Sequence, residues 1–481
     1  MKVLFLTPLA SARELWGQYE RGGGAYFPLG LLSVAGVALK AGHQVELLDV
    51  STLRTTSEQL EQKLVGGDFD VIGLGNCYTS LAHLVFRTAE FCRKILPHAK
   101  LVVGGIHPTL FPNETLEVCP ALDFAVFGEG ELTFEELLKY LNNEGSELRQ
   151  IQGLCYRSGQ EVRCNEPRPP IKDISELPPL PYHLLDIDSY VPPPSNYKRL
   201  PTYGFLVQRG CPYRCAYCDA RVHGRIVRHD NIDKIIGQMK YLIQNHGMKG
   251  IIFHDSCLTI NRRFSVEFFS RMIDEKINVA WCCYTRVDKV DPELLSLMKK
   301  AGCWSVSFGL ESGNQVSLER IHKGVTLAQN REGVRMAKKA GLQVVGSFIL
   351  CLPGEDEQMS RNTIKFAKEL NLDTAVFFLP VPFFGTEIYE MCKAEDALPE
   401  DIKWEDFKMW MDPTNPIYVN PLIGDKKMVK LYNEAVSSFY LSPKTLMRSL
   451  MQIHSVSDLR KYSKGFISII EIIKRRFKQV Q

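Results

Sequence analysis

Three cysteines stand close together in the segment RGCPYRCAYCDA, residues 209–220. Cys211, Cys215 and Cys218 form a CxxxCxxC pattern directly after an apolar run that predicts a strand. A structural zinc site needs four Cys or His ligands, and the nearest histidine, His223, has no second partner at a usual spacing. A 4Fe-4S cluster that is held by three thiolates keeps one iron open to a ligand from outside the protein. The pattern therefore favours a cluster whose fourth ligand is a substrate or cofactor.

The cysteine segment opens a series of six predicted strand–helix units. Short apolar runs alternate with helix-length segments from Tyr203 to about residue 392. This alternation predicts an incomplete version of the eight-stranded barrel, a partial (β/α)6 barrel, in which the site lies at the carboxyl ends of the strands. The predicted strands are Tyr203–Gln208, Ile251–His254, Ala280–Tyr284, Trp304–Gly309, Gln343–Leu350 and Thr374–Leu379.

The first 145 residues show a separate alternation of strands and helices. Five short apolar strands, separated by helix-length segments, predict a doubly wound parallel sheet. Sheets of this kind bind ligands at the carboxyl ends of their strands. The predicted strands are Val3–Leu6, Gln44–Leu48, Val71–Leu74, Leu101–Val103 and Asp123–Phe127, and the predicted helices are Leu29–Ala41, Ser57–Val65, Ala82–Ile95 and Thr133–Asn142.

A high density of proline marks the boundary between these two regions. Ten of the 26 prolines lie between Cys164 and Pro201, and proline at that density sustains neither a helix nor a central strand. The region after about Lys393 is predicted to be helical. We therefore divide the chain into a doubly wound domain (1–145), a proline-rich linker (146–201), a partial barrel (202–392) and a helical C-terminal region (393–481).

Composition and charge argue against several classes of protein. The 58 basic and 55 acidic residues give a net charge of +3, so no overall field attracts the chain to nucleic acid. The first residues, MKVLFLTPL, contain an apolar run that is too short for a signal peptide. No stretch of the chain approaches the length of about 20 apolar residues that spans a bilayer. Fourteen cysteines without an export signal indicate a reducing compartment, so we expect a cytoplasmic protein whose thiols are mostly free.

The cysteine segment resembles the signature of the radical SAM superfamily, which is CxxxCxxC with an aromatic residue before the last cysteine, here Tyr217. In that family the open iron of a 4Fe-4S cluster chelates the amino and carboxylate groups of S-adenosylmethionine (SAM). The resemblance implies that Cys211, Cys215 and Cys218 bind the cluster. The alternative is that these cysteines are three free thiols on a loop. Their spacing, the aromatic residue and the position after a strand all match the family signature, which disfavours this alternative.

The resemblance also assigns SAM contacts to residues that follow the later strands. Asp255, in FHDSCLTIN, occupies the place that holds the methionine amino group, and Arg286, in YTRVD, could pair with the methionine carboxylate or form an ordinary salt bridge. Glu311, in FGLESG, could accept hydrogen bonds from the ribose hydroxyls or act as a helix N-terminal charge. Ser347 in GSFILCLPGE and Pro382 in LPVPFFGTEIYE lie in segments whose glycines and prolines allow a close approach to adenine, although a turn needs the same residues.

A five-stranded doubly wound domain ahead of such a barrel resembles the cobalamin-binding domain of one radical SAM subclass. By this resemblance, Thr79 and Ser80 could meet the nucleotide tail of cobalamin, and Gly104 and Gly105 leave room for the tail beside the sheet. Gly128, in FGEGE, forms another glycine turn. The alternative is a generic nucleotide-type fold that has lost its ligand, since no GxGxxG motif follows the first strand.

The loop after the first predicted strand lacks the DxHxxG motif that supplies a histidine ligand to cobalt in the usual cobalamin-binding fold. The loop reads PLASARELWGQYERGGG, so we expect the cobalt to have no histidine ligand. His107 follows the fourth strand instead, where a lone histidine is expected to be an ordinary hydrogen-bonding residue.

The cysteines outside the signature show no second cluster spacing. We therefore expect no auxiliary iron–sulfur cluster, and we expect these residues to be small buried apolar side chains. They include Cys155, Cys164, Cys257, Cys282, Cys283, Cys303, Cys351 and Cys392.

Together these resemblances imply a cobalamin-dependent radical SAM enzyme with a small-molecule substrate and a reducing electron donor. In such enzymes a 5′-deoxyadenosyl radical removes hydrogen from an unactivated carbon. C-methylation through methylcobalamin is the leading hypothesis, and radical oxidation, cyclisation or ring rearrangement of a tetrapyrrole or isoprenoid-lipid-like substrate is the alternative. A non-catalytic sensor that holds cobalamin and a cluster would be a different class, which the complete set of strand-end motifs disfavours.

The C-terminal segment, Arg460–Gln481, carries seven basic residues and one acidic residue. Phe466, Ile470, Ile473 and Phe477 recur at helical spacing. Such a helix could lie on a membrane surface, in keeping with an apolar substrate, or it could dock on the barrel with its charges outward.

Overall fold

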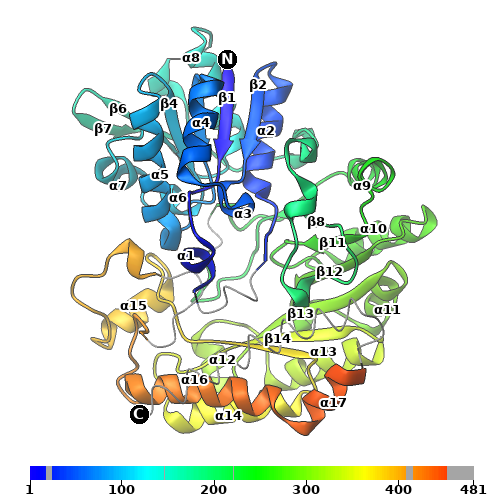
Figure 1. Cartoon of the computed structure of the whole chain (residues 1–481). Coiled ribbons are helices and arrows are strands. Elements are labelled where there is room, and N and C mark those ends of the chain that lie inside the picture. Colours follow the sequence, from blue (N-terminus) through cyan, green and yellow to red (C-terminus); the bar gives the residue numbers. More distant parts are fainter. Residues whose placement is uncertain (18–23, 146, 220–221, 408–414, 452–481) are drawn as a thin grey trace.

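Two parallel sheets organise the molecule, one near each end of the view in Figure 1. The computed structural model describes residues 1–17, 24–145, 147–219, 222–407 and 415–451. The first sheet has the strand order β2-β1-β3-β4-β5-β6-β7, in which β1 to β5 run parallel and β6 and β7 run antiparallel. Its strands are β1 (Lys2–Leu6), β2 (Gln44–Leu48), β3 (Val71–Leu74), β4 (Lys100–Gly104), β5 (Phe124–Val126), β6 (Leu154–Ser158) and β7 (Glu161–Cys164).

Helices cover both faces of this first sheet, because alternate residues of each strand point to opposite sides. Val3 and Phe5 of β1 pack in a core with α2 and α8, whereas Leu4 and Leu6 pack in a core with α4 and α5. This arrangement confirms the predicted doubly wound domain. The helices are α1 (Ala12–Trp16), α2 (Leu29–Lys40), α3 (Val50–Leu53), α4 (Ser57–Gly67), α5 (Ala82–Ile95), α6 (Ile106–Leu110), α7 (Pro112–Val118) and α8 (Gly130–Leu141), with a short 3-10 helix, η2 (Thr79–Leu81).

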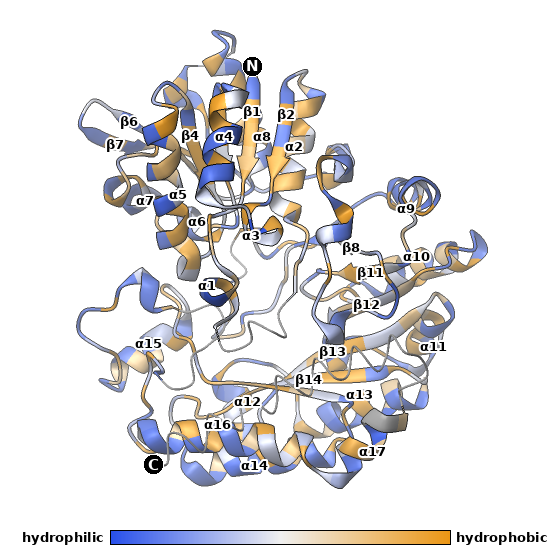
Figure 2. Ribbon diagram, viewed as in Figure 1, coloured by the Kyte–Doolittle hydropathy of each residue, from blue (hydrophilic) through white to orange (hydrophobic). Residues whose placement is uncertain are grey.

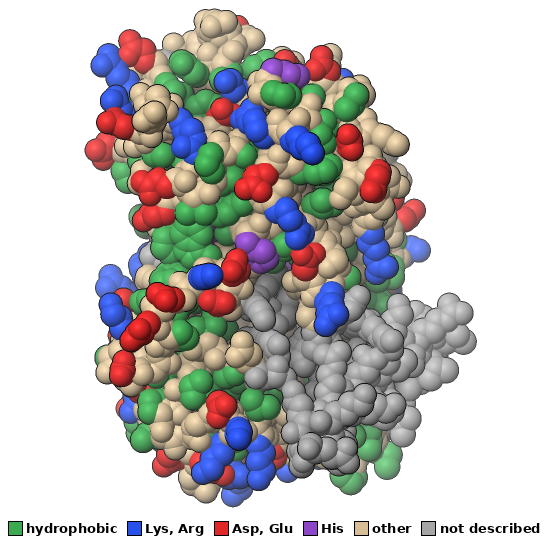
Figure 3. Space-filling model, turned by 60° about the vertical axis from the view of Figure 1, so that its left-hand side comes forward, with side chains coloured by type: hydrophobic (Ala, Val, Ile, Leu, Met, Phe, Trp, Pro, Cys, Tyr) green, Lys and Arg blue, Asp and Glu red, His purple; other side chains and the backbone are tan. Residues whose placement is uncertain are grey.

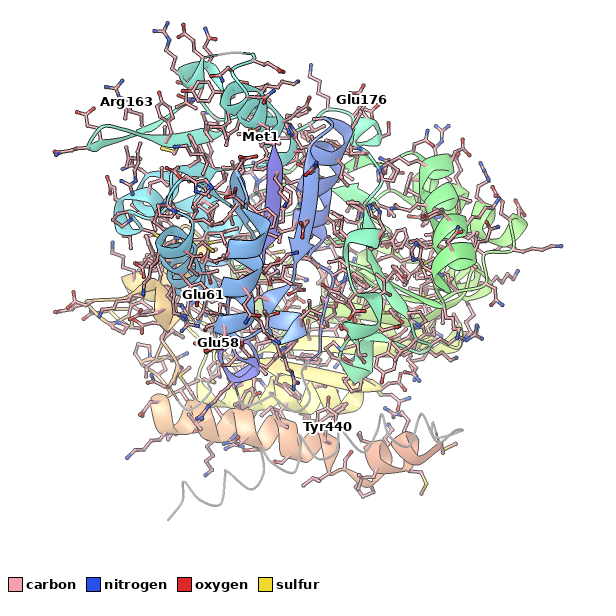
Figure 4. All side chains as sticks on the ribbon, turned by 45° about the horizontal axis from the view of Figure 1, so that its top comes forward. Met1, Glu58, Glu61, Arg163, Glu176 and Tyr440 are labelled. Carbon is pink, nitrogen blue, oxygen red and sulfur yellow. A yellow bond between two sulfur atoms is a disulfide. The ribbon has the colours of Figure 1, made fainter. Side chains whose placement is uncertain are left out.

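The β6–β7 hairpin extends the first sheet beyond the boundary at residue 145 that the sequence analysis predicts (Figure 4, where Arg163 marks the hairpin). The chain turns at Gly159, whose φ of 67° is in the left-handed region that glycine tolerates. Cys155 and Cys164 lie directly opposite each other in the hairpin and form a disulfide. The expectation that these two cysteines are plain buried residues is therefore wrong, because the hairpin pairing brings them face to face.

The proline-rich segment packs between the two sheets, and we call it the strap. The ring of Phe27 stacks on Tyr190 of this segment, with centroids 4.4 Å apart, and on Tyr203 of the second sheet, with centroids 5.2 Å apart. Tyr190 also donates a hydrogen bond to Asp49 in the first domain, at 2.8 Å. A continuous hydrophobic core consequently runs from the first sheet through this strap into the second sheet.

The second sheet has six parallel strands in the order β15-β14-β13-β12-β11-β8, which is the predicted partial barrel. Its strands appear hydrophobic in Figure 2, and the helices around it show one apolar and one polar side. The strands are β8 (Thr202–Phe205), β11 (Gly250–Phe253), β12 (Ala280–Thr285), β13 (Cys303–Glu311), β14 (Gln343–Ile349) and β15 (Thr374–Phe378). The helices are α9 (Ile232–His246), α10 (Arg262–Asp274), α11 (Pro292–Lys300), α12 (Gln315–Arg320), α13 (Leu327–Lys339), α14 (Glu357–Glu369) and α15 (Glu387–Ala394).

The C-terminal region packs against the last barrel strand. Helix α16 (Asp425–Tyr440) contacts β15 and α14, and the Tyr440 hydroxyl donates a hydrogen bond to the Ala375 carbonyl at 2.8 Å (Figure 4). Helix α17 (Pro443–Met451) follows, and the predicted amphipathic segment Arg460–Gln481 lies outside the described residues. Among the described residues, no helix is long and apolar enough to cross a membrane. On the face in Figure 3, acidic and basic side chains are interspersed.

Candidate functional site

A short antiparallel ribbon closes the base of the loop that carries the three cysteines. Strand β9 (Gln208–Arg209) precedes this cysteine loop and pairs with β10 (Arg228–His229), which follows it. Gly210 has a φ of 91°, and a Cβ at this position would collide with the carbonyl oxygen of Ile226. The chain therefore enters the loop through a tight backbone turn at Gly210, one residue before Cys211.

The three thiols of this loop are accessible and lie close enough to affect one another. Cys211 and Cys215 are half-buried and Cys218 is exposed, and none of the three forms a disulfide. Burial and the neighbouring Cys215 and Cys211 raise the pKa of Cys218 to about 11, against the opposite effect of the Lys323 charge. Mutual repulsion of this kind disfavours three free thiolates, whereas iron stabilises them. The donor set thus fits a 4Fe-4S cluster, in which each thiolate binds a different iron.

Arg286 follows β12 and lies beside the cysteine loop. Its guanidinium is 3.6 Å from the ring centroid of Tyr213, and its Nε donates to Asp288 at 2.8 Å. Nη2 donates to the Lys323 carbonyl at 2.8 Å, but Nη1 is buried and has no hydrogen-bond partner among the described residues. An orphaned guanidinium nitrogen next to the thiols fits a carboxylate ligand better than it fits an ordinary surface salt bridge.

Asp255 follows β11 and is fully buried. Its Oδ1 accepts hydrogen bonds from the backbone N–H groups of Val207 and Gln208, at 3.0 and 2.7 Å. Its Oδ2 is buried and has no hydrogen-bond partner in the part of the chain that the structure describes. Asp255 therefore fixes the turn from β8 into the cysteine loop, and its contact with the SAM amino group stays a prediction.

The buried carboxyl of Asp255 gives an expected dependence of stability on pH. Burial raises its pKa from 3.8 to about 7, so the carboxylate destabilises the fold as the pH rises from about 4 to above 7. We expect Asp255→Asn to unfold with a free energy higher by on the order of 2 kcal/mol at pH 8, because a charge penalty of roughly 4 kcal/mol disappears and burial of an amide N–H costs roughly 2. Urea unfolding of the apoprotein at pH 8 and pH 5 measures this, and an advantage that persists unchanged at pH 5 would contradict it.

Glu311, Tyr217 and Lys323 form a buried polar group at the end of β13. Glu311 Oε1 accepts from the Tyr217 hydroxyl at 2.7 Å and from Lys323 Nζ at 2.8 Å. Gly309 is required beneath them, because a Cβ there would collide with Glu311 and Lys323. The sequence analysis names Glu311 and Tyr217 but misses Lys323, which follows a helix rather than a strand and so has no strand-end signal.

The two residues assigned to the adenine site lie on the last two strand ends. Ser347 is half-buried on β14, in register with Gly309 of β13 and Val376 of β15. Pro382 is buried just after β15. Ser347 therefore lies on the sheet that carries Glu311 and Pro382 follows its last strand, and their contact with adenine stays a prediction.

A cavity of about 770 Å³ lies between the carboxyl ends of the first sheet and the barrel. Phe5 of β1 and Gly73 of β3 are in its wall, so the cavity opens where the strand order reverses, as expected for a doubly wound sheet. Cys218 of the cysteine loop and Tyr284 of the barrel line the same cavity. One cavity therefore joins the ligand-binding edge of the first sheet to Cys218 of the cysteine loop.

Three of the five residues assigned to cobalamin line this cavity. Gly104, Gly105 and Gly128 are in its wall, and a Cβ at Gly128 would meet no atom within 4 Å. A Cβ at Gly104 would come no closer than 3.9 Å to Val126, so the open space there belongs to the cavity. Thr79 and Ser80 are instead buried in η2, outside the lining. Open glycine cradles of this kind fit a large ligand that lies against the backbone.

His107 occupies an aromatic pocket beside this glycine turn. It is fully buried against Phe111 and against Trp404 of the C-terminal region, with centroids 5.3 and 4.4 Å away. Neither ring nitrogen has a hydrogen-bond partner among the described residues, so the expectation of an ordinary hydrogen-bonding histidine is wrong. Burial lowers the pKa of His107 to about 4, which makes the imidazole neutral.

The fold combines a doubly wound sheet with a partial barrel, and the ligand-binding edge of the sheet faces the cysteine loop of the barrel. This arrangement defines a class of two-domain α/β proteins that hold two cofactors. Residues 205–367 match the Radical SAM superfamily, and residues 21–138 match the B12 binding domain. The "Uncharacterized methyltransferase PH0819" of Pyrococcus horikoshii is 32% identical over 428 residues, which cover 89% of this chain and 90% of that protein. The chain therefore belongs to the radical SAM superfamily, among its members with a cobalamin-binding domain.

Other relatives and solved structures agree with this family. The anaerobic magnesium-protoporphyrin IX monomethyl ester cyclase of Cereibacter sphaeroides is 28% identical over 402 residues, which cover 81% of this chain and 63% of that protein. The structure of the radical SAM methyltransferase TsrM from Kitasatospora setae, with cobalamin and a 4Fe-4S cluster bound, has a TM-score of 0.70 at 15% identity and covers 100% of both chains. The cobalamin-dependent radical enzyme OxsB has a TM-score of 0.64 at 20% identity and covers 82% of this chain and 55% of that chain.

Proposed function

We propose that this chain is a cobalamin-dependent radical SAM enzyme that methylates an unactivated carbon of a small molecule. The observation that carries the proposal is the single cavity lined both by Cys218 of the cysteine loop and by the glycine turns of the first sheet. Cofactors bound at these two places would face each other across one cavity, which methyl transfer between them and a substrate requires.

The barrel residues have complementary roles in this proposal. Cys211, Cys215 and Cys218 hold the cluster, and Arg286 donates its free Nη1 to the SAM carboxylate. Glu311, held by Lys323, faces the ribose. Tyr217 donates a hydrogen bond that keeps the Glu311 carboxylate in place. Asp255 accepts from the amino group of SAM, and Ser347 and Pro382 contact the adenine.

The first domain supplies the second cofactor site. Gly104, Gly105 and Gly128 leave space for cobalamin against the sheet edge. Thr79 and Ser80 are buried in η2, and the contact of their hydroxyls with the nucleotide tail stays a prediction. When bound, the cluster supplies the electron for SAM cleavage and cobalamin carries the methyl group; the chain itself orients both and excludes water.

Radical cyclisation or oxidation is the second candidate, because a relative that aligns with 81% of this chain is a cyclase. The same visible residues serve both reactions. Methylation is favoured because the relative that is 32% identical across 89% of the chain is named a methyltransferase. A non-catalytic sensor would not need the orphaned Arg286 nitrogen beside the thiols.

Further properties of the enzyme follow as part of the proposal. The cluster needs a one-electron donor, because cleavage of SAM consumes an electron that the chain does not store. An apolar substrate would match the aromatic side chains Tyr26 and Tyr284 at the cavity. We also propose a cytoplasmic enzyme. The basic segment Arg460–Gln481 lies outside the described residues, and its contact with a membrane surface or with the barrel stays a prediction.

Products of an anaerobic turnover test the proposed reaction. The protein, reconstituted with iron, sulfide and cobalamin, is incubated with SAM and a strong reductant, and the nucleosides are identified by mass. We expect 5′-deoxyadenosine together with S-adenosylhomocysteine, because one SAM is cleaved and a second donates its methyl group to cobalt. Deoxyadenosine alone would support oxidation or cyclisation, and neither product from a protein with an intact cluster would support the sensor.

A further inference from the structure

Two arginines lie directly opposite each other at the base of the cysteine loop. Arg209 of β9 pairs in register with Arg228 of β10, and both side chains are buried, with 9% and 8% of their surface exposed. Arg209 precedes Cys211 by two residues. Like charges at directly opposite positions destabilise an antiparallel pair, so the ribbon that closes this loop needs compensating negative charge.

Two glutamates from the first domain supply that charge. Glu129 accepts two hydrogen bonds from Arg228, at 2.7 and 2.9 Å, and lies 3.4 Å from Arg209 Nη1. Glu131 accepts from Arg209 Nη2 at 2.5 Å and from the Ser33 hydroxyl at 2.5 Å. Both glutamate side chains are almost fully buried, with 2% and 5% exposed.

The four side chains form a closed and charge-balanced group, which we call the clamp: Glu129, Glu131, Arg209 and Arg228. Burial favours neutral carboxyls, but hydrogen bonds from His223 and Arg228 and the charge of Arg209 lower the pKa of Glu129 to about 2. The backbone N–H of Ile171 also donates to Glu129 at 2.7 Å. Because every charge has a partner of opposite sign, loss of one member leaves an uncompensated buried charge, which is far more costly than loss of a surface pair.

The clamp joins the two cofactor regions that the proposed function requires. Glu129 is the N-cap residue of α8 and Glu131 lies in the first turn of that helix, directly after Gly128, which is in the cavity wall. Arg209 and Arg228 bracket the cysteine loop. Among the described residues, only Glu129 and Glu131 of the first domain form salt bridges with the β9–β10 ribbon. Glu129 also pairs with His223 of the cysteine loop, at 3.1 Å.

We propose that Glu129 and Glu131 are positioning residues that hold the cysteine loop closed from the cobalamin domain. The FGEGE turn therefore has two roles: its glycine borders the cobalamin cavity, and its glutamates fix the ribbon from which the cluster ligands extend. This inference rests on the proposed function, since it takes the cysteine loop as the cluster site.

Iron retention in the reconstituted full-length protein tests the clamp. Glu129→Gln keeps the size of the side chain but leaves the clamp with one excess positive charge. We expect a chelator to remove iron from this variant roughly tenfold faster, or more, than from the wild type, because the base of the loop opens more often. The loss is followed by cluster absorbance, so SAM cleavage is not needed.

Asp123→Asn is the matched control. Asp123 is another carboxylate of the first domain, half-buried, and it pairs with Arg93 at 2.5 Å away from the ribbon. The same carboxylate-to-amide change there should leave iron loss at the wild-type rate. An equal acceleration in both variants would mean that general destabilisation of the domain, and not the clamp, controls the loop.

A double variant separates charge balance from packing. Glu129→Gln with Arg228→Gln restores neutrality, since Glu131 still pairs with Arg209. We expect the double variant to retain iron longer than either single variant, even if a single variant folds poorly. Additive losses in the double variant, or an unchanged rate in Glu129→Gln, would overturn the clamp. A wild-type protein that takes up no cluster would instead contradict the proposed function.

Discussion

Cys215→Ala removes the iron–sulfur absorption and reduces SAM cleavage to background. Two thiolates cannot replace three around a cluster whose fourth iron site is already reserved for SAM, so the cluster is lost rather than weakened. The change should leave the fold intact, because Cys215 is half-buried on a loop and belongs to no hydrophobic core. Iron content, visible absorption and deoxyadenosine formation measure the effect.

Cys119→Ala is the control for this prediction. Cys119 is a fully buried thiol in the core of the first domain, and its loss removes a sulfur atom without touching the cysteine loop. We expect normal iron content and normal cleavage in this variant. Retention of both the cluster and SAM cleavage in Cys215→Ala would falsify the assignment of the cluster site.

Local patterns were sufficient to predict most of the strands and helices. The bounds of β2, β3 and α5 agree with the prediction residue for residue. The apolar runs of β2 and β3 end at Asp49 and Gly75, which mark the ends of these strands in the sequence. The first barrel strand differs: β8 ends at Phe205, whereas the prediction continues to Gln208. Asp255 explains this difference, because the backbone N–H groups of Val207 and Gln208 donate to its carboxylate and not to a neighbouring strand.

Long-range contacts are what the sequence pattern could not reveal. Residues 154–164 look like the start of a linker until they pair with the edge of β5. Lys323 becomes part of the site only because β13 brings Glu311 beside it. Glu129 and Arg228 are 99 residues apart in the chain, so nothing local in FGEGE indicates that its carboxylates bind the ribbon below the cysteines.

The residues assigned to cobalamin also show what a sequence pattern cannot reveal, here within a single short turn. Gly104, Gly105 and Gly128 line the cavity, and their contact with cobalamin stays a prediction. Thr79 and Ser80 were chosen for their hydroxyls, but the η2 turn buries both side chains. The direction of a side chain in a short irregular turn depends on φ and ψ values that residue type alone does not determine.

Gly104→Leu weakens cobalamin binding roughly tenfold to a hundredfold, while the iron content stays at the wild-type level. The leucine fits the protein, because a Cβ at Gly104 meets no atom closer than 3.9 Å, but it fills space in the cavity that the ligand needs. Gly105 is a poorer choice for this test, since its φ of 132° and the nearby Cys77 carbonyl make any side chain a strain on the backbone.

The matched control for Gly104→Leu is Gly66→Leu, at an exposed glycine of α4 that also has free space around it. Equilibrium titration with cobalamin, followed by absorbance, gives the two dissociation constants, and iron analysis of the same samples shows whether the barrel is intact. Gly104 lies on the first sheet and the cysteines lie on the barrel, so a leucine at position 104 should affect cobalamin binding and not iron binding. Weaker cobalamin binding with full iron content would therefore indicate a cofactor site on the first sheet. Equal affinities in both variants would place the cobalamin away from the Gly104 turn and would remove the main support for methyl transfer across this cavity.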